Sequence, residues 1–158
     1  MTYDNISLLF GAFAPDKIVK GKHSVQEIHL FIDAMGGDHA PIAPVKGSVL
    51  ALRRDPRLKI SLAGILSEIE PLLADAGDVR GRITLVDAPE VITNHDAPAL
   101  AVRQMKKSSI VMGMLSVREG ASDGFVSAGS TGAVLVGGML RLGRIPGIER
   151  PALAPMLP

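Results

Sequence analysis

The chain has 158 residues, of which 47% are hydrophobic and 21% charged, with 17 glycines and 11 prolines. These values predict a single α/β domain with a packed core and exclude a disordered or fibrous chain. A net charge of +1 and only 3% aromatic residues argue against nucleic-acid binding and favour a small ligand. The absence of cysteine excludes disulfides and thiolate catalysis, and it suits a reducing compartment.

The first 26 residues show no sustained hydrophobic period. Ile6–Phe10 is compatible with either a strand or one helical turn. The apolar stretch Ile6–Ala14 is too short to span a bilayer, and no Lys or Arg precedes it, which argues against a secretory signal. We expect residues 1–26 to form a poorly ordered extension and the protein to be cytoplasmic.

Strand and helix patterns alternate after this extension. Apolar runs predict three strands: Ile28–Ile32, Leu58–Gly64 and Arg82–Val86. Between the first two, apolar residues recur at helical spacing and stop at Arg53 and Arg54 before a proline, which predicts a helix and its end. Ser67 and Glu70 have the capping-box spacing, which predicts a helix from Ser67 to Leu73.

The second half of the chain continues the alternation. Asp87–Pro98 is predicted to be a loop, and its polar cluster Thr93–Asp96 is expected to cap the next helix. That helix pattern runs from Ala99 to about Glu119 with an interruption at Lys106–Ser109, so two helices or one bent helix are both allowed. The remaining predicted elements are a strand at Gly124–Ser127, a helix from Ser130 to about Leu142, a turn at Gly143–Arg150 and the start of a strand at Ala152–Pro155.

This alternation predicts a three-layer α/β/α fold, with a mostly parallel sheet covered by helices on both faces. In such sheets, ligands bind beyond the carboxyl ends of the strands. The strand expected at Ala152–Pro155 has no following element to cover it, so the chain resembles the front part of a longer fold.

Two glycine-rich turns are expected at that edge. The segment Phe125–Val134 leads from an apolar run through a small-residue turn into a helix, which places unpaired N–H groups and hydroxyls at a helix start. Phosphate is the first ligand to consider, although a tight turn with Ser130 as a helix cap explains the residues equally well. The second turn, Asp33–Pro41, holds Asp38 and more polar chemistry than a turn requires, which favours a functional role.

Several common motifs are missing from the sequence. Neither the dinucleotide fingerprint nor the Walker loop occurs at a strand-to-helix turn. Ala128–Gly132 places its hydroxyl one position too early for a hydrolase elbow. The four histidines lack metal-ligand spacing. We therefore predict no cofactor and no metal site.

Three segments together resemble the bacterial phosphate acyltransferases of phospholipid synthesis: Ile32–Pro41, Val126–Ala133 and Arg150–Pro155. Further residues are similar to the central helix pattern of that family: Asp96, Pro98, Ala101, Arg103, Lys106, Lys107, Ser108 and Ser109. The resemblance covers about residues 27–158. It leaves residues 1–26 unmatched and implies that the chain holds the N-terminal half of such a protein.

The resemblance implies transfer of a long-chain acyl group from acyl carrier protein to inorganic phosphate, which gives acyl phosphate. It also implies a fold related to isocitrate and isopropylmalate dehydrogenases, a homodimer and loose membrane association. Two alternatives stay open. One is a decarboxylating dehydrogenase on the related fold, and the other is a truncated half-domain without activity.

Phosphate is already anionic at neutral pH, so it can attack a thioester without a protein nucleophile, and the protein supplies placement and charge stabilisation. The Gly36–Gly37 turn or the His39 ring is expected to stabilise the oxyanion, and His39 alternatively protonates the leaving thiolate. On a helix, Arg103, Lys106 and Lys107 are most simply a solvated face; with the resemblance, they are candidate contacts for the carrier protein. The expected phosphate- or substrate-binding residues are Asp33, Gly36, Gly37, Asp38, Ser127, Gly129, Ser130, Thr131 and Gly132.

Overall fold

The structure is a computed structural model that describes residues 26–149. The predictions for the extension at residues 1–26 and for a strand at Ala152–Pro155 lie, apart from residue 26, outside the described residues.

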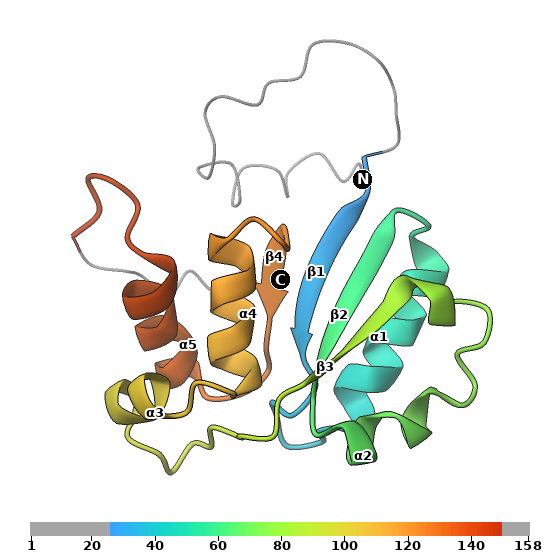
Figure 1. The fold of residues 1–158 in the computed structure, drawn as a ribbon, viewed down its shortest axis with the longest axis horizontal. Coiled ribbons are helices and arrows are strands. Elements are labelled where there is room, and N and C mark those ends of the chain that lie inside the picture. The colour runs from blue at the N-terminus through green and yellow to red at the C-terminus, as the bar shows by residue number, and fades with distance from the viewer. Residues whose placement is uncertain (1–25, 150–158) are drawn as a thin grey trace, which may run out of the picture.

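Four parallel strands form the centre of the described fold (Figure 1). Their order across the sheet is β3-β2-β1-β4, so the first strand in sequence lies in the interior of the sheet. In the register, Ile32 of β1 pairs with Leu62 on one side and Val126 on the other. The strands are β1 (Ile28–Asp33), β2 (Leu58–Gly64), β3 (Ile83–Asp87) and β4 (Gly124–Val126).

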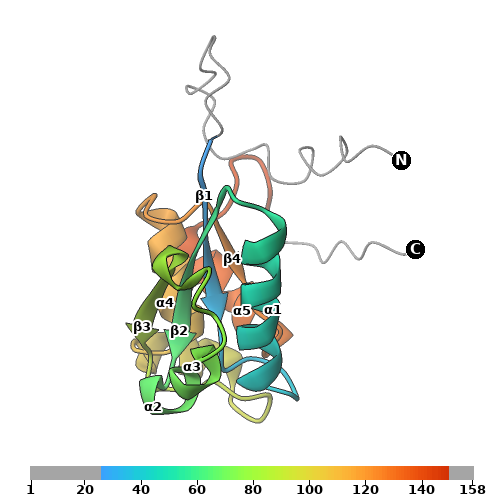
Figure 2. The ribbon, with the colours of Figure 1, turned by 90° about the vertical axis from the view of Figure 1, so that its right-hand side faces the viewer.

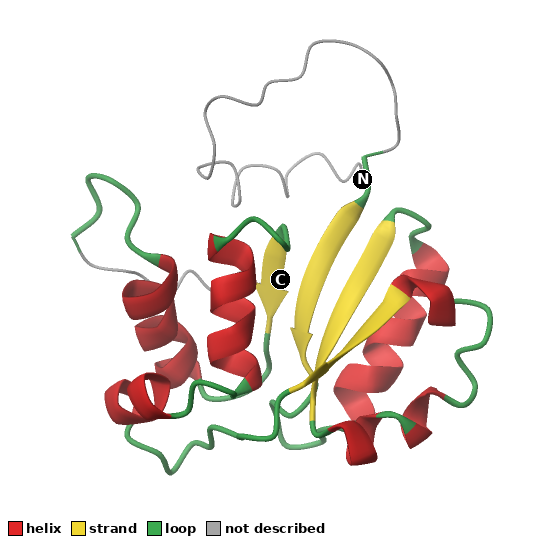
Figure 3. Cartoon of the chain, viewed as in Figure 1, coloured by secondary structure: helices red, strands yellow, loops and turns green. Residues whose placement is uncertain are grey.

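Helices cover both faces of this sheet, which confirms the predicted α/β class. Helix α1 (Ile42–Arg54) covers one face, and α4 (Ser109–Arg118) covers the other (Figure 2). Beyond β4, α5 (Thr131–Gly137) packs against α4 and α3 (Pro98–Gln104) and continues as a π-helical segment to Leu142. The connection from β3 to α3 runs along the edge where the strands end (Figure 3).

The core on each face follows from strand alternation, because successive side chains point to opposite sides. On one face, Val45 and Leu52 of α1 pack with Leu62 in the larger hydrophobic cluster. On the other, Phe31 and Phe125 face α4, where a side chain in place of Gly113 would overlap the Phe125 ring. A glycine in α4 therefore allows the helix to lie close to the sheet.

One helix prediction is confirmed, and another needs correction. The break expected at Lys106–Ser109 is confirmed, because α3 ends at Gln104 and α4 begins at Ser109. The predicted helix from Ser67 to Leu73 is instead a four-residue α2 (Leu66–Ile69) followed by a 3-10 turn, Pro71–Leu73. Ser67 does not cap it, because α2 begins one residue earlier, after Ile65, and has no side-chain cap. A second 3-10 turn, Arg80–Arg82, leads into β3.

The predicted cap at Thr93–Asp96 is also wrong. Asp96 accepts hydrogen bonds from the backbone N–H and the hydroxyl of Thr93, at 2.7 and 2.8 Å. Helix α3 begins with Pro98 after Ala97 and has no side-chain cap. The polar cluster closes its own turn, and a proline at the helix start leaves one N–H fewer to satisfy.

Candidate functional site

The two glycine turns meet at one edge of the sheet because β1 and β4 are parallel neighbours. A β-carbon added to Gly36 would lie 2.7 Å from the backbone nitrogen of Gly129, and one added to Gly129 would lie 3.2 Å from the Cα of Gly36. Gly37 has a φ of 97°, a region that favours glycine. The expectation that both turns face one edge is confirmed. Their close contact is possible because glycine has no side chain.

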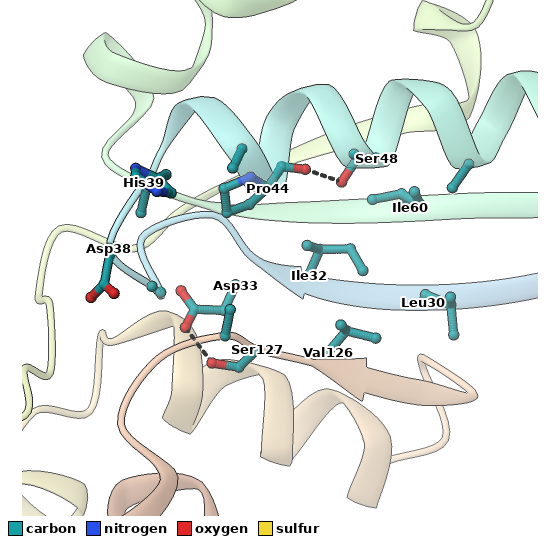
Figure 4. Close-up of a pocket in the computed structure, with 17 residues that line it drawn as sticks. Leu30, Ile32, Asp33, Asp38, His39, Pro44, Ser48, Ile60, Val126 and Ser127 are labelled. Atoms are coloured by element: carbon teal, nitrogen blue, oxygen red, sulfur yellow. Dashed lines mark hydrogen bonds between the residues drawn. The ribbon is translucent and has the colours of Figure 1, made fainter. Parts of the chain in front are cut away.

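Asp33 connects the two turns through its carboxylate (Figure 4). Its side chain is 3% exposed, and Oδ1 accepts hydrogen bonds from the N–H of Met35 at 3.0 Å and the hydroxyl of Ser109 at 2.6 Å. Oδ2 accepts from the hydroxyl of Ser127 at 2.7 Å. Both oxygens thus accept hydrogen bonds from the protein, and these bonds join the two turns to each other and to the start of α4. The role of Asp33 in binding phosphate or substrate stays a prediction.

Ser109 is a site residue that the sequence analysis did not assign to the site. It begins α4, and its buried hydroxyl reaches Asp33 across 76 positions in sequence. The available signal was a pair of serines immediately before the apolar run Ile110–Val111. One of them, Ser108, caps α4 by accepting from the N–H of Val111, which leaves the other free to bind the carboxylate.

The backbone donors of the second turn divide into two groups. The N–H of Gly129 donates to the Ser127 hydroxyl at 3.0 Å, and the N–H of Ala133 donates to the Ser130 hydroxyl at 3.4 Å. Gly129 is thus already engaged within the protein, whereas Ser130 caps α5 as the simpler interpretation predicted. The following N–H groups donate no hydrogen bond to a described residue: Gly36, Gly37, Ser130, Thr131 and Gly132.

Gly132 has a packing role that the sequence did not reveal. A β-carbon at this position would lie 2.9 Å from Cγ of Pro98, the first residue of α3. A larger side chain would therefore separate α5 from α3. Loss of phosphate binding in a Gly132 variant would not by itself place phosphate at this residue.

A cleft of about 510 Å³ opens beside the turns (Figure 4). Gly36, Gly37 and Ser127 line its mouth together with Asp38 and His39. Asp38 and His39 are exposed on the connection from β1 to α1. Within residues 26–149, the His39 ring makes no hydrogen bond, so both ring nitrogens are available to a bound molecule.

The three basic residues also lie near this end of the sheet. Arg103 is in the last turn of α3, and Lys106 and Lys107 lie in the link to α4, all exposed. The backbone N–H of Lys107 donates to Glu90 at 2.6 Å, and Ser109, two residues later, contacts the site through Asp33. The link that carries the lysines is therefore held in place while their ammonium groups face solvent.

No three histidine, aspartate or glutamate side chains among residues 26–149 lie close enough together to hold a metal ion. Of the helices in this part of the chain, none has the length and apolar character needed to cross a membrane.

A protein-family model described as "Fatty acid synthesis protein" matches residues 28–158. The chain is 53% identical over 127 residues to a phosphate acyltransferase of Levilactobacillus brevis, covering 80% of this chain and 36% of the relative. It is 47% identical to the phosphate acyltransferases of Halalkalibacterium halodurans and Thermoanaerobacter pseudethanolicus, covering 80% and 83% of this chain. The chain spans a little over a third of the length of these curated relatives.

Proposed function

The chain belongs to the fatty acid synthesis protein family, and from this we propose that it supplies the phosphate-binding part of a phosphate acyltransferase. The proposed reaction transfers a long-chain acyl group from acyl carrier protein to inorganic phosphate and yields acyl phosphate. The resemblance noted from the sequence motifs and the names of the relatives both support this assignment.

The contact between Gly36 and Gly129 at the mouth of the cleft is the observation that carries the proposal. It brings two sets of backbone N–H groups together at one edge. Neutral amide donors can hold a phosphate without neutralising it, so the anion keeps its nucleophilicity. A bound phosphate beside a bound thioester needs no bimolecular encounter, which removes several kcal/mol from the barrier.

Formation of the tetrahedral intermediate places negative charge on the former carbonyl oxygen. Donors that already point at this position stabilise it without reorganisation. We assign this role to the Gly36–Gly37 turn, with His39 either donating to the oxyanion or protonating the leaving thiolate. His39→Ala should then lower kcat at least tenfold. His95→Ala, which changes an exposed histidine on the loop before α3, is the matched control and should retain full activity.

We propose that the carrier protein binds over Arg103, Lys106 and Lys107, because its phosphopantetheine arm must reach the same edge of the sheet. The support is the position of the two lysines, close before Ser109 in a link held by Glu90. Charge reversal with Lys106→Glu should raise the KM for carrier thioester and leave the KM for phosphate unchanged. Attraction between exposed charges also makes this KM sensitive to salt.

Consumption of carrier thioester by the chain, measured with and without phosphate, tests the proposed reaction. We expect consumption only with phosphate, accompanied by an equal amount of acyl phosphate in the ³¹P NMR spectrum. Consumption that does not depend on phosphate would contradict the assignment. Because the chain spans little more than a third of its relatives, phosphate binding without turnover would support the second candidate, a half-domain that needs further residues for activity.

A further inference from the structure

The cleft extends from the two turns along the face of the sheet that α1 only partly covers. Its floor is aliphatic, with Leu30 and Ile32 of β1, Ile60 of β2 and Val126 of β4. Apart from Asp33, Asp38, His39 and Ser127 at the end nearest the turns, the one polar side chain lining it is Ser48, whose hydroxyl already donates to the carbonyl of Pro44 at 2.8 Å. A molecule bound in the interior of the cleft therefore does not need to form hydrogen bonds with it.

The wall formed by α1 lacks long side chains. Ala43, Gly47 and Ala51 recur four residues apart, so they lie on one helix face, and all three line the cleft. A β-carbon at Gly47 would meet no atom within 4 Å. Glycine weakens a helix interior, and in the described residues no close contact requires it here. Its effect is to keep the cleft open, and Val126 on the floor is correspondingly 51% exposed.

We propose that this cleft binds the aliphatic chain of the acyl group, a site that deepens the proposed function and rests on it. An acyl phosphate or acyl thioester is apolar along its chain and polar at one end. The cleft has the same arrangement, since aliphatic walls lead to a mouth lined by Gly36, Gly37 and His39. From Ala43 to Ala51 the wall is about 12 Å long, a shape that suits an extended chain. The volume lies within the usual range for small-molecule sites.

Binding of two probe series to the chain, measured by calorimetry below the aggregation limit of each probe, tests the proposal. The first series is inorganic phosphate, butyl phosphate, octyl phosphate and decyl phosphate, and the second is the matching 1-alkanols. Each added methylene that enters the cleft should lower Kd about fourfold until the cleft is filled.

Gly47→Leu is the discriminating variant, because its side chain enters open space and improves helix propensity. It should remove the dependence of Kd on chain length and weaken decyl phosphate binding more than tenfold, while inorganic phosphate binding is unchanged. Lys46→Leu adds the same side chain at an exposed α1 position that does not line the cleft, and it should behave as wild type. An unchanged or raised Tm for Gly47→Leu excludes misfolding as the cause.

The two series separate this proposal from the proposed function. If alkanols show a length dependence that Gly47→Leu removes while inorganic phosphate fails to bind, the acyl site stands and the phosphate site fails. If inorganic phosphate binds but chain length has no effect, or Gly47→Leu leaves the effect intact, the acyl site is refuted and the phosphate site stands. If Gly47→Leu changes the molar mass of the particle in solution, and the Kd of neither probe series depends on chain length, the cleft is an interface with a second copy of the chain. This result would also refute the proposal.

Discussion

Asp33 is a buried carboxylate whose two oxygens accept from one backbone N–H and two hydroxyls. Through Ser109 it holds the start of α4, and through Ser127 it holds the segment after β4. The Ser127 hydroxyl in turn accepts from the N–H of Gly129. One side chain thus sets the distance between the two turns, and the anion-binding geometry depends on it.

Asp33→Asn should lower the free energy of unfolding by about 2 kcal/mol, because an amide NH₂ cannot accept the hydroxyl hydrogen bond made to the oxygen it replaces. Urea unfolding followed by circular dichroism measures the change. Asp38→Asn, on the same turn but exposed, is the matched control and should change the value by less than about 0.5 kcal/mol. Equal losses in the two variants would show that the Asp33 hydrogen bonds do not stabilise the fold.

At this scale, residue types and spacing identified both turns and the capping role of Ser130. They could not show how the donors are used, because that depends on contacts between distant segments. The N–H of Gly129 donates to the Ser127 hydroxyl, and this hydroxyl donates to Asp33, a contact that only the pairing of β1 with β4 reveals. Gly132 against Pro98 is a second contact of this kind.

Among the α-helices, α4 and α5 begin with a serine side-chain cap, whereas α1, α2 and α3 have none. Ser108→Ala should lower the free energy of unfolding by about 1 to 2 kcal/mol, because it removes the cap on the Val111 N–H from a fully buried position. Ser67→Ala is the comparison, since the sequence predicts a cap there that the structure lacks. For Ser67→Ala, urea unfolding should show almost no change in the free energy of unfolding. A loss as large as that of Ser108→Ala would show that Ser67 does cap α2, as the sequence predicts.

The connection from α1 to β2 carries a pH-sensitive contact. Hydrogen bonds from Arg57 lower the pKa of Asp55 from 3.8 to about 2. The ion pair therefore stabilises the fold above pH 4, and this contribution is lost as pH falls through the range from 4 to 2. The difference in Tm between wild type and Arg57→Ala should shrink over that range. Arg54→Ala, at the exposed end of α1, should show a pH-independent difference, and the same behaviour in Arg57→Ala would contradict the assignment.

Hydrophobic periodicity was sufficient to predict the alternation of strands and helices and the break between α3 and α4. It failed at residues 66–73, where the loss of one backbone donor decides the local conformation. These residues form a short helix and a 3-10 turn because Pro71 has no N–H to donate to the carbonyl of Ser67, so the α-helical hydrogen bonds end at Glu70. A capping-box pattern carries no information about that constraint.

For the whole molecule, the sequence predicts parallel strands but not their order. In the order β3-β2-β1-β4, the strands β2 and β3 lie on one side of β1 and β4 lies on the other. The pairing of β1 with β4 brings residues 33–41 and 127–132 together. Local pattern contains no such information, because it depends on which crossover returns to which side of β1. The same order leaves the aliphatic cleft beside α1, which no sequence motif indicated.

Titration of inorganic phosphate into the isotope-labelled chain, followed by amide chemical shifts at constant ionic strength, tests the central claim that the two turns bind phosphate together. The account predicts saturable shifts that are largest at Gly36, Gly37, Ser130, Thr131 and Gly132, and weaker binding in Gly36→Ala, whose new methyl group would separate the turns. Largest shifts at Lys106 and Lys107, or five unmoved turn amides at saturating phosphate, would contradict it.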